Sequence, residues 1–324
     1  MAYSGAARVN DRKAVVVGCG FVGSSSAFAL MQSGLFSEIA LIDVDRARAE
    51  GEALDIAHGS PFAPSPVKVY AGTYEDAADA AIVVVTAGAA QKPGETRLDL
   101  VNKNVAIFKS VVPAIAASGF GGILLVVSNP VDVLTYAAVK LSGLPESHVI
   151  GSGTVLDSAR LKQKLGQHLG VDPRDVHAWI IGEHGDSELA AWSSANVSGV
   201  ALSDFCEMRG HFDHKDAEQR ILDEVRRSAY EIIDRKHATY YGIAMSVRRL
   251  CEAIMRDEKR ILPVSSLMVG EYGLSDICIS LPAIVGRDGV ECRVPISLDA
   301  DEDAALKASA DALRTVVDQL DLEA

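Results

Sequence analysis

The chain lacks the positive charge that marks nucleic-acid-binding proteins. It has 31 lysine and arginine residues against 44 aspartate and glutamate residues, which gives a formal net charge of −13. This excess of negative charge argues against nucleic acid or an anionic membrane surface as a partner. An anionic ligand would therefore need locally placed cations that act against the overall field.

Signals for disulfides, targeting and membrane insertion are also missing from the sequence. The five cysteines are odd in number and widely spaced, so we expect reduced thiols and no metal site. The N-terminus has no basic region followed by an apolar core, and no apolar run approaches the length needed to span a bilayer. We find no internal repeat and no low-complexity segment. These absences predict a soluble cytoplasmic protein.

Apolar runs are present in a regular alternation over the first half of the chain. With 324 residues, 48% of them hydrophobic, the chain can form one large domain or two ordinary ones. Short Val/Ile/Leu-rich strands that alternate with helices indicate a parallel sheet covered on both faces. We therefore predict an α/β fold with a doubly wound dinucleotide-binding (Rossmann) domain over residues 1–151. The expected strands are Lys13–Val17, Glu38–Asp43, Val67–Tyr70, Ile82–Thr86, Ile123–Val127 and Val149–Gly151.

The pattern changes after residue 151, where helices and strands no longer alternate regularly. Long helical periodicity occupies Asp216–Met255, and Val264–Glu291 is typical of antiparallel strands joined by glycine-containing turns. A closing amphipathic helix is expected from Asp301 onward. We also expect a helix over Val155–Leu169 and a strand over Val176–Ile181. Residues 152–324 are thus predicted to form an α+β substrate-binding domain.

A glycine motif follows the first predicted strand and begins a helix. The residues are Gly18, Cys19, Gly20, Phe21, Val22 and Gly23, which match G-x-G-x-x-G. The first glycine permits the tight turn, the second lets a pyrophosphate approach the backbone, and the third lets helix and strand pack closely. In this context the motif predicts a dinucleotide at the helix N-terminus.

Asp43 ends the second predicted strand, twenty residues beyond Gly23. At this position an acid would accept hydrogen bonds from the adenosine ribose, and it would repel a 2′-phosphate. The alternative is that Asp43 only begins a turn with Asp45. The order of strand, glycines, helix and acid favours the cofactor interpretation, with NAD rather than NADP.

Four polar residues in the middle of the chain are candidates for chemistry. His184 follows an apolar strand and is flanked by glycines in the sequence. Its imidazole suits it to proton transfer, although a lone histidine is more often structural. Asp157 and Arg160 share one side of a helix, where they could orient His184 and bind a carboxylate, or form only a surface ion pair. Asn129 follows a strand at the carboxyl edge of the sheet, where ligands of this fold bind.

The loop Ala90–Arg97 leaves the end of another predicted strand. Pro93 and Gly94 are turn residues, and the loop also carries the neutral amide of Gln91 and the cation of Arg97. A solvated loop needs neither residue in particular. A loop that closes over a ligand could need both.

Together these segments resemble the lactate/malate dehydrogenase family over nearly the whole chain. The matching motifs are GCGFVG at 18–23, LIDVD at 41–45, AGAAQKPGETR at 87–97, SNPVD at 128–132, LDSAR at 156–160 and IIGEHGD at 180–186. Each is weak alone, but their occurrence in this order is specific.

The resemblance implies a role for each matched residue. His184 would be the acid/base group and Asp157 its carboxylate partner, while Arg160 would bind the substrate carboxylate. Arg97 would polarise the reacting carbonyl from a closing loop. Asn129 would contact substrate and cofactor, and Thr239 would line the substrate pocket.

The resemblance also gives Gln91 a meaning, because this family position faces the substrate side chain. Malate dehydrogenases typically have an arginine there to pair with a second carboxylate, whereas glutamine would leave that carboxylate buried and unpaired. Thr239 agrees with a lactate-type member. The implied activity is NAD-dependent interconversion of pyruvate and L-lactate. The alternatives are a malate or broad-specificity 2-hydroxy-acid dehydrogenase, or a catalytically inactive NAD-binding protein.

Regulation and assembly are expectations from the resemblance alone. Many bacterial members are activated by fructose 1,6-bisphosphate, bound by an arginine and a histidine where subunits meet. The corresponding residues here are Lys162 and His177, and lysine keeps the charge but not the bidentate geometry. Both could equally be residues without a ligand. The family also implies a homotetramer.

Overall fold

The fold is built on one mixed sheet that runs through both halves of the chain. The computed structural model describes residues 12–89 and 97–322. In this part the sheet has nine strands in the order β14-β13-β12-β6-β5-β4-β1-β2-β3. Its parallel strands are β1 (Lys13–Val17), β2 (Glu38–Ile42), β3 (Lys68–Ala71), β4 (Ile82–Val85), β5 (Ile123–Val126) and β6 (Val149–Gly151). Their order, 3-2-1-4-5-6, is that of the doubly wound dinucleotide-binding fold, as the sequence predicts.

The second half of the chain extends this sheet with antiparallel strands. These are β12 (Arg260–Val269), β13 (Ser275–Gly286) and β14 (Gly289–Arg293). β12 joins β6 through the pair Ser265 and Gly151. The sequence predicts antiparallel strands here but not that they continue the first sheet, because no local pattern specifies pairing across 114 residues.

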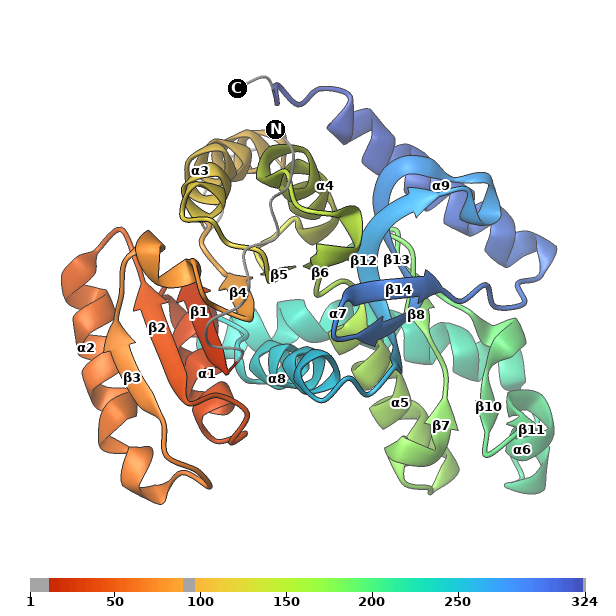
Figure 1. The fold of residues 1–324 in the computed structure, drawn as a ribbon. Coiled ribbons are helices and arrows are strands. Elements are labelled where there is room, and N and C mark those ends of the chain that lie inside the picture. Colours follow the sequence, from red (N-terminus) through yellow and green to blue (C-terminus); the bar gives the residue numbers. More distant parts are fainter. Residues whose placement is uncertain (1–11, 90–96, 323–324) are drawn as a thin grey trace.

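Helices cover both faces of the sheet because alternate strand residues are apolar on both sides. Val15, Val83 and Leu124 face one core, and Val16, Val84 and Leu125 face the other. Figure 1 shows the two helical layers. The first core is closed by α3 (Arg97–Ala117), α4 (Val131–Ser142) and α9 (Ala300–Val317), and the second by α1 (Phe21–Met31), α2 (Arg46–His58) and α8 (Tyr241–Met255).

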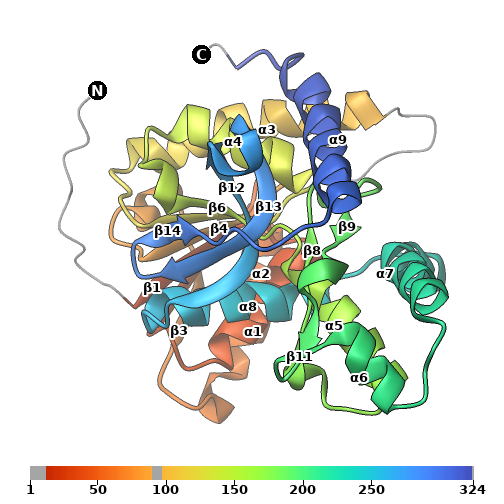
Figure 2. The same ribbon diagram turned by 90° about the vertical axis from the view of Figure 1, so that its right-hand side faces the viewer.

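A smaller unit with its own apolar core lies beside the sheet (Figure 2). Leu161 and Leu165 of one helix pack there with Val176 and Val225. Its elements are α5 (Val155–Leu169), β7 (Val176–His177), β8 (Ile180–Ile181), β9 (Leu189–Ala190), β10 (Asn196–Val197), β11 (Val200–Ala201), α6 (Leu202–Met208) and α7 (His214–Lys236).

Two predicted elements are divided in the structure. The strand expected over Val176–Ile181 is two short strands, of which β7 pairs with β10 and β8 with β9. The helical stretch Asp216–Met255 is two helices, because α7 ends at Lys236 and the next residue, His237, adopts a left-handed conformation with φ of 67°. The long helix therefore stops just before Thr239, and a new helix begins at Tyr241.

One helix corrects the expectation that no segment approaches the length of a membrane span. Leu98–Ala117 is long and apolar enough by length and composition. This segment belongs to α3, and its residues Val105, Phe108 and Val112 are buried in the first core. Packing against the sheet accounts for the apolar face of the helix.

Candidate active site

The turn between β1 and α1 has the shape that the three glycines predict. Gly18 has φ of +97°, and a β-carbon on it would lie 2.6 Å from the backbone nitrogen of Ala87. A β-carbon on Gly23 would lie 1.8 Å from the carbonyl oxygen of Gly18. Nothing lies within 4 Å of the corresponding point on Gly20, which leaves the backbone open to a bound group. These residues fit a dinucleotide whose pyrophosphate rests on the turn.

Asp43 lies directly after β2 and contacts the same turn. One carboxylate oxygen accepts a hydrogen bond from the backbone N–H of Cys19 at 2.6 Å, and the other accepts one from Asp45 at 2.9 Å. Both interpretations of Asp43 are thus compatible with the structure, since it shapes the turn and also lines a cavity. That cavity measures about 690 Å³, and Gly18, Gly20 and Arg48 also line it.

Phe21 and Val22 occupy the first turn of α1 and are not among the residues that line this cavity. The Phe21 side chain is exposed, and its ring stacks on Tyr240 with 5.3 Å between centroids. Val22 packs against the core on the α1 face of the sheet. The structure thus places both side chains next to the turn but not in the cavity.

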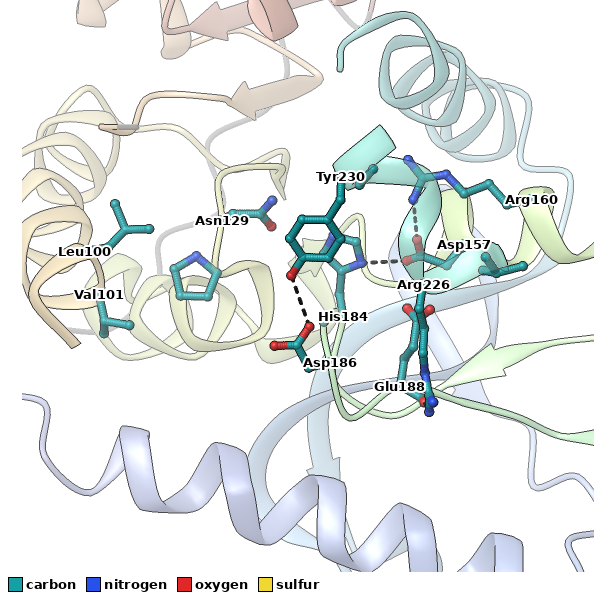
Figure 3. A pocket seen from close by; sticks show the side chains of 14 residues that line it. Leu100, Val101, Asn129, Asp157, Arg160, His184, Asp186, Glu188, Arg226 and Tyr230 are labelled. Carbon is teal, nitrogen blue, oxygen red and sulfur yellow. Dashed lines mark hydrogen bonds and ion pairs between the residues drawn. The ribbon is translucent and has the colours of Figure 1, made fainter. Parts of the chain in front are cut away.

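A second cavity, of about 350 Å³, lies where the sheet meets the smaller unit (Figure 3). Asn129 lines it from the carboxyl end of β5, and Asp157 and Arg160 line it from α5. His184 lines it from the loop after β8. Residues that are distant in the sequence therefore meet at one edge of the sheet, as expected from the carboxyl ends of parallel strands.

Asp157 joins His184 and Arg160 in a buried ion-pair network. Nδ1 of His184 lies 2.5 Å from one carboxylate oxygen of Asp157, and Arg160 donates to the other at 2.8 Å. The Asp157 side chain is only 2% exposed, which rules out the surface ion pair considered from the sequence. A guanidinium has five N–H donors, so one bond to Asp157 leaves others for a ligand.

The surroundings of His184 favour its protonated form. Burial alone would lower the pKa of His184, but the charge and hydrogen bond of Asp157 outweigh it and raise the pKa to about 9. Burial likewise opposes ionisation of Asp157, yet His184 and Arg160 hold the pKa of that carboxyl group below its usual range. At neutral pH the pair is therefore an imidazolium and a carboxylate.

The loop that carries His184 is fixed by residues that the sequence interpretation missed. Asp132 of α4 accepts a hydrogen bond from the backbone N–H of His184 at 2.7 Å. Ser309 of α9 accepts one from the backbone N–H of Glu183 at 2.9 Å. Asp132 lies within the SNPVD motif and could have been noticed, whereas the Ser309 contact spans 126 residues and has no local signal.

Asn104 of α3 is another missed residue, and it connects two loops at the edge of the sheet. Its side-chain oxygen accepts from the backbone N–H of Ala89 at 2.7 Å, and its amide group donates to the carbonyl oxygen of Asn129 at 2.8 Å. Asn104 is buried, so these contacts satisfy a polar group that would otherwise be costly. They position Asn129 beside the cavity.

Three predicted residues are not placed at the cavity by the structure. Gln91 lies outside the described residues, and Arg97 is the first residue of α3, where only its backbone is described. Thr239 lies half-buried between α7 and α8 and is not among the residues that line the cavity. Instead, Arg226, Ala229 and Tyr230 of α7 form this wall.

Lys162 and His177 lie on α5 and β7, which pack against each other. The ammonium group of Lys162 sits 4.7 Å from the centre of the Trp179 ring, so it is not the fully solvated helix charge of the alternative interpretation. Burial, together with nearby Arg260, lowers the pKa of Lys162. His177 is exposed.

The cavity also holds a third acidic side chain, Glu188, close to Asp157 and His184. One polar atom from each of the three lies within 4.8 Å of the others. Asp157 is already bonded to His184 and Arg160, and Arg226 lies alongside. Arg160 and Arg226 therefore lie beside the negative charges of this cluster. No metal is predicted here from the sequence.

The sequence and the fold both match known proteins. Residues 12–151 match the family description "lactate/malate dehydrogenase, NAD binding domain", and residues 154–323 match "lactate/malate dehydrogenase, alpha/beta C-terminal domain". The five cysteines, all in the described part of the chain, are free thiols. The cofactor cavity thus lies within the part that matches the NAD-binding domain.

Relatives and solved structures agree over almost the full length. The chain is 49% identical to an L-lactate dehydrogenase of Thermoanaerobacter sp. (strain X514), covering 96% of this chain and 99% of the relative. It is 51% identical to one of Bacillus velezensis (strain DSM 23117 / BGSC 10A6 / LMG 26770 / FZB42), covering 96% and 97%. The ligand-bound minor L-lactate dehydrogenase of Enterococcus mundtii superposes with a TM-score of 0.93 at 47% identity, covering 97% of this chain and 99% of that one. The chain belongs to the lactate/malate dehydrogenase family.

Proposed function

We propose that this chain is an NAD-dependent L-lactate dehydrogenase that interconverts pyruvate and L-lactate. The observation that carries the proposal is the bridging of His184 and Arg160 by buried Asp157 at the wall of one cavity. This arrangement offers a proton donor and a carboxylate-binding cation at one place. Both are needed for the reduction of a 2-oxo acid.

His184 has the geometry of a proton donor to the substrate oxygen. Its Nδ1 is bonded to Asp157, so Nε2 is the nitrogen that remains for the substrate. NADH, when bound, supplies the hydride to the carbonyl carbon. His184 gives its proton to the carbonyl oxygen, and Asp157 holds the ring in place and stabilises its charged form. In lactate oxidation the neutral ring would accept the proton.

Arg160 would orient the substrate by its carboxylate, which brings the reacting carbon toward the cofactor. Asn129 would contact both substrate and cofactor. Arg97 would stabilise the negative charge that develops on the carbonyl oxygen, and Thr239 would border the pocket. We propose that residues 1–151 bind NAD through Gly18–Gly23 and Asp43, and that residues 152–324 supply most of the substrate site.

The choice of pyruvate over oxaloacetate is assigned to Gln91. A neutral side chain at that position leaves a second carboxylate without a counter-charge, which costs several kcal/mol in a dry site. The relatives at 49–51% identity are named L-lactate dehydrogenases, which supports the same choice. A malate-type or broad-specificity enzyme is the alternative.

We also propose that the enzyme is a cytoplasmic homotetramer activated by fructose 1,6-bisphosphate. The effector would bind at Lys162 and His177 where two subunits meet. The support is the pair of cationic residue types on adjoining elements, in a chain with a net charge of −13. The ammonium group of Lys162 lies 4.7 Å from the centre of the Trp179 ring, which restricts where it can lie.

The test is the loss of NADH absorbance with pyruvate and with oxaloacetate, measured side by side on the purified protein. We expect kcat/KM for pyruvate to exceed that for oxaloacetate by at least about tenfold, or 1.4 kcal/mol. A preference for oxaloacetate would support a malate dehydrogenase. Absence of turnover with either substrate would support an inactive NAD-binding protein.

A further inference from the structure

Glu188 is a buried acid beside the His184–Asp157 pair that the proposed mechanism does not use. It is only 3% exposed and lies on the loop that follows His184. Its carboxyl group, the Asp157 carboxylate and a ring nitrogen of His184 lie within 4.8 Å of one another. Figure 3 shows Glu188 beside this pair. A charge at this distance in a poorly solvated site interacts strongly with an imidazolium.

The carboxyl group of Glu188 is unusual because it has no hydrogen bond or ion pair within the described part of the chain. Arg226 of α7 donates at 2.5 Å to the backbone carbonyl of Glu188, not to its side chain. Burial and the charge of Asp157 raise the pKa of Glu188 to about 8, although His184, Arg226 and Arg160 oppose this. Glu188 therefore loses its proton at a higher pH than an ordinary glutamate does, closer to the pH at which His184 titrates.

The other acids around the cavity are engaged elsewhere. Asp132 of α4 accepts a hydrogen bond from the backbone N–H of His184, and its charge also helps to raise the pKa of the ring. Asp186 accepts from the hydroxyl of Tyr230 at 3.1 Å, and Glu183 accepts from Ser187 at 2.5 Å. Among the described residues, Glu188 is thus the acid near the His184 ring whose carboxyl group accepts no hydrogen bond.

We propose that Glu188 is a positioning residue for proton transfer, whose ionised carboxyl group keeps His184 protonated at higher pH than Asp157 alone would. This inference rests on the proposed role of His184. As Glu188 loses its proton to solvent, its negative charge stabilises the imidazolium across the short gap. Pyruvate reduction, which needs the imidazolium, then continues further into the alkaline range. Lactate oxidation, which needs the neutral ring, begins at correspondingly higher pH.

The decisive variant is Glu188→Gln, which removes the charge and keeps the shape. We expect the loss in kcat/KM for pyruvate to be smallest at acidic pH, where Glu188 carries its proton, and to grow as the pH rises. The alkaline decline of kcat/KM should shift to lower pH by about one unit, which is a roughly tenfold loss on that limb. The rise of lactate oxidation with pH should shift in the same direction, so the variant gains activity near pH 8.

Glu302→Gln is the matched control. Glu302 is also a buried glutamate, but it accepts from the backbone of Ser193 and Asp299 at the start of α9 and does not line the cavity. This variant should leave both pH profiles in place. NADH affinity, followed by fluorescence, should be unchanged in either variant.

One result would overturn the inference. It is that Glu188→Gln lowers pyruvate reduction and lactate oxidation by the same factor at every pH, so that its pH profiles run parallel to those of the wild type. If the glutamine variant does not fold, Glu188→Asp is the test. Its shorter side chain moves the charge away from His184, so the decline of pyruvate reduction and the rise of lactate oxidation should both shift to lower pH, by less than in the glutamine variant. Unshifted limbs in that variant would overturn the proposal. Failure of the wild type to reduce pyruvate would instead overturn the proposed function, so the two failures are distinguishable.

Discussion

At the scale of single residues, His184 depends on charges placed around it more than on its own chemistry. A buried histidine alone would be neutral at physiological pH, and Asp157, 2.5 Å from its ring, favours the protonated form that the proposed role requires. Asp157 in turn stays ionised because Arg160 bonds its second oxygen. We propose that the same logic governs specificity, where the lack of a charge at position 91 would decide which substrate can be buried.

Replacing Gln91 with arginine should move the preference from pyruvate toward oxaloacetate. Arginine supplies a counter-charge for the second carboxylate and leaves an unpaired charge against a methyl group. The ratio of kcat/KM for the two substrates should change by more than about tenfold, or 1.4 kcal/mol. A smaller change, measured with NADH at saturation, would mean that Gln91 is not the discriminating residue.

At the scale of secondary-structure elements, the turn from β1 to α1 shows how sequence specifies a binding site. Gly18 and Gly23 are needed for the backbone to pack, whereas Gly20 faces open space. Gly18 and Gly23 therefore serve the fold, and we propose that Gly20 leaves room for the cofactor. The distances around each glycine fit the separate roles that the sequence motif predicts.

Alanine at Gly20 and at Gly23 should have different consequences. Gly20→Ala should fold with an unchanged thermal midpoint but bind NADH at least about tenfold more weakly, because its methyl group occupies the place of the pyrophosphate. Gly23→Ala should lower the thermal midpoint, because its β-carbon would collide with the carbonyl oxygen of Gly18. Calorimetry and NADH fluorescence titration of both variants distinguish these outcomes. An equal loss of stability in the two variants would contradict this assignment.

Elements with a strong local pattern could be predicted from the sequence. The buried strands β1 and β6 and the helix α5 have the predicted bounds, because continuous apolar runs and helical periodicity mark them. The break between α7 and α8 was missed because the left-handed residue there is His237 rather than glycine. The division of Val176–Ile181 was missed because strand pairing depends on distant partners.

At the scale of the whole molecule, the site is made by contacts that no local pattern reveals. The resemblance predicts the pairing of His184 with Asp157, which lies 27 residues earlier. It does not indicate Asn104, Ser309 or Glu188, because their contacts arise only when the helices pack on the sheet. Assembly beyond one chain is likewise an expectation of the family.

Fructose 1,6-bisphosphate should tighten pyruvate binding if Lys162 and His177 face their symmetry mates. Without the effector, like charges would repel across the interface, and a bisphosphate would relieve that repulsion and favour the assembled enzyme. Pyruvate saturation curves with and without millimolar effector test this. Overlapping curves at slightly acidic pH would exclude the site.

The most direct test of the proposed function, and of His184 as its proton donor, is pyruvate reduction by the wild type and by His184→Ala. NADH binding is measured on the same samples. We expect the wild type to consume NADH with pyruvate and the variant to lose roughly 10²–10⁴-fold in kcat, the usual contribution of a positioned proton donor. NADH affinity should be nearly equal in the two proteins, because the cofactor cavity is lined by residues of the first half of the chain. A wild type inactive on pyruvate would contradict the proposed function. A His184→Ala variant that keeps its turnover would contradict the proposed role of His184.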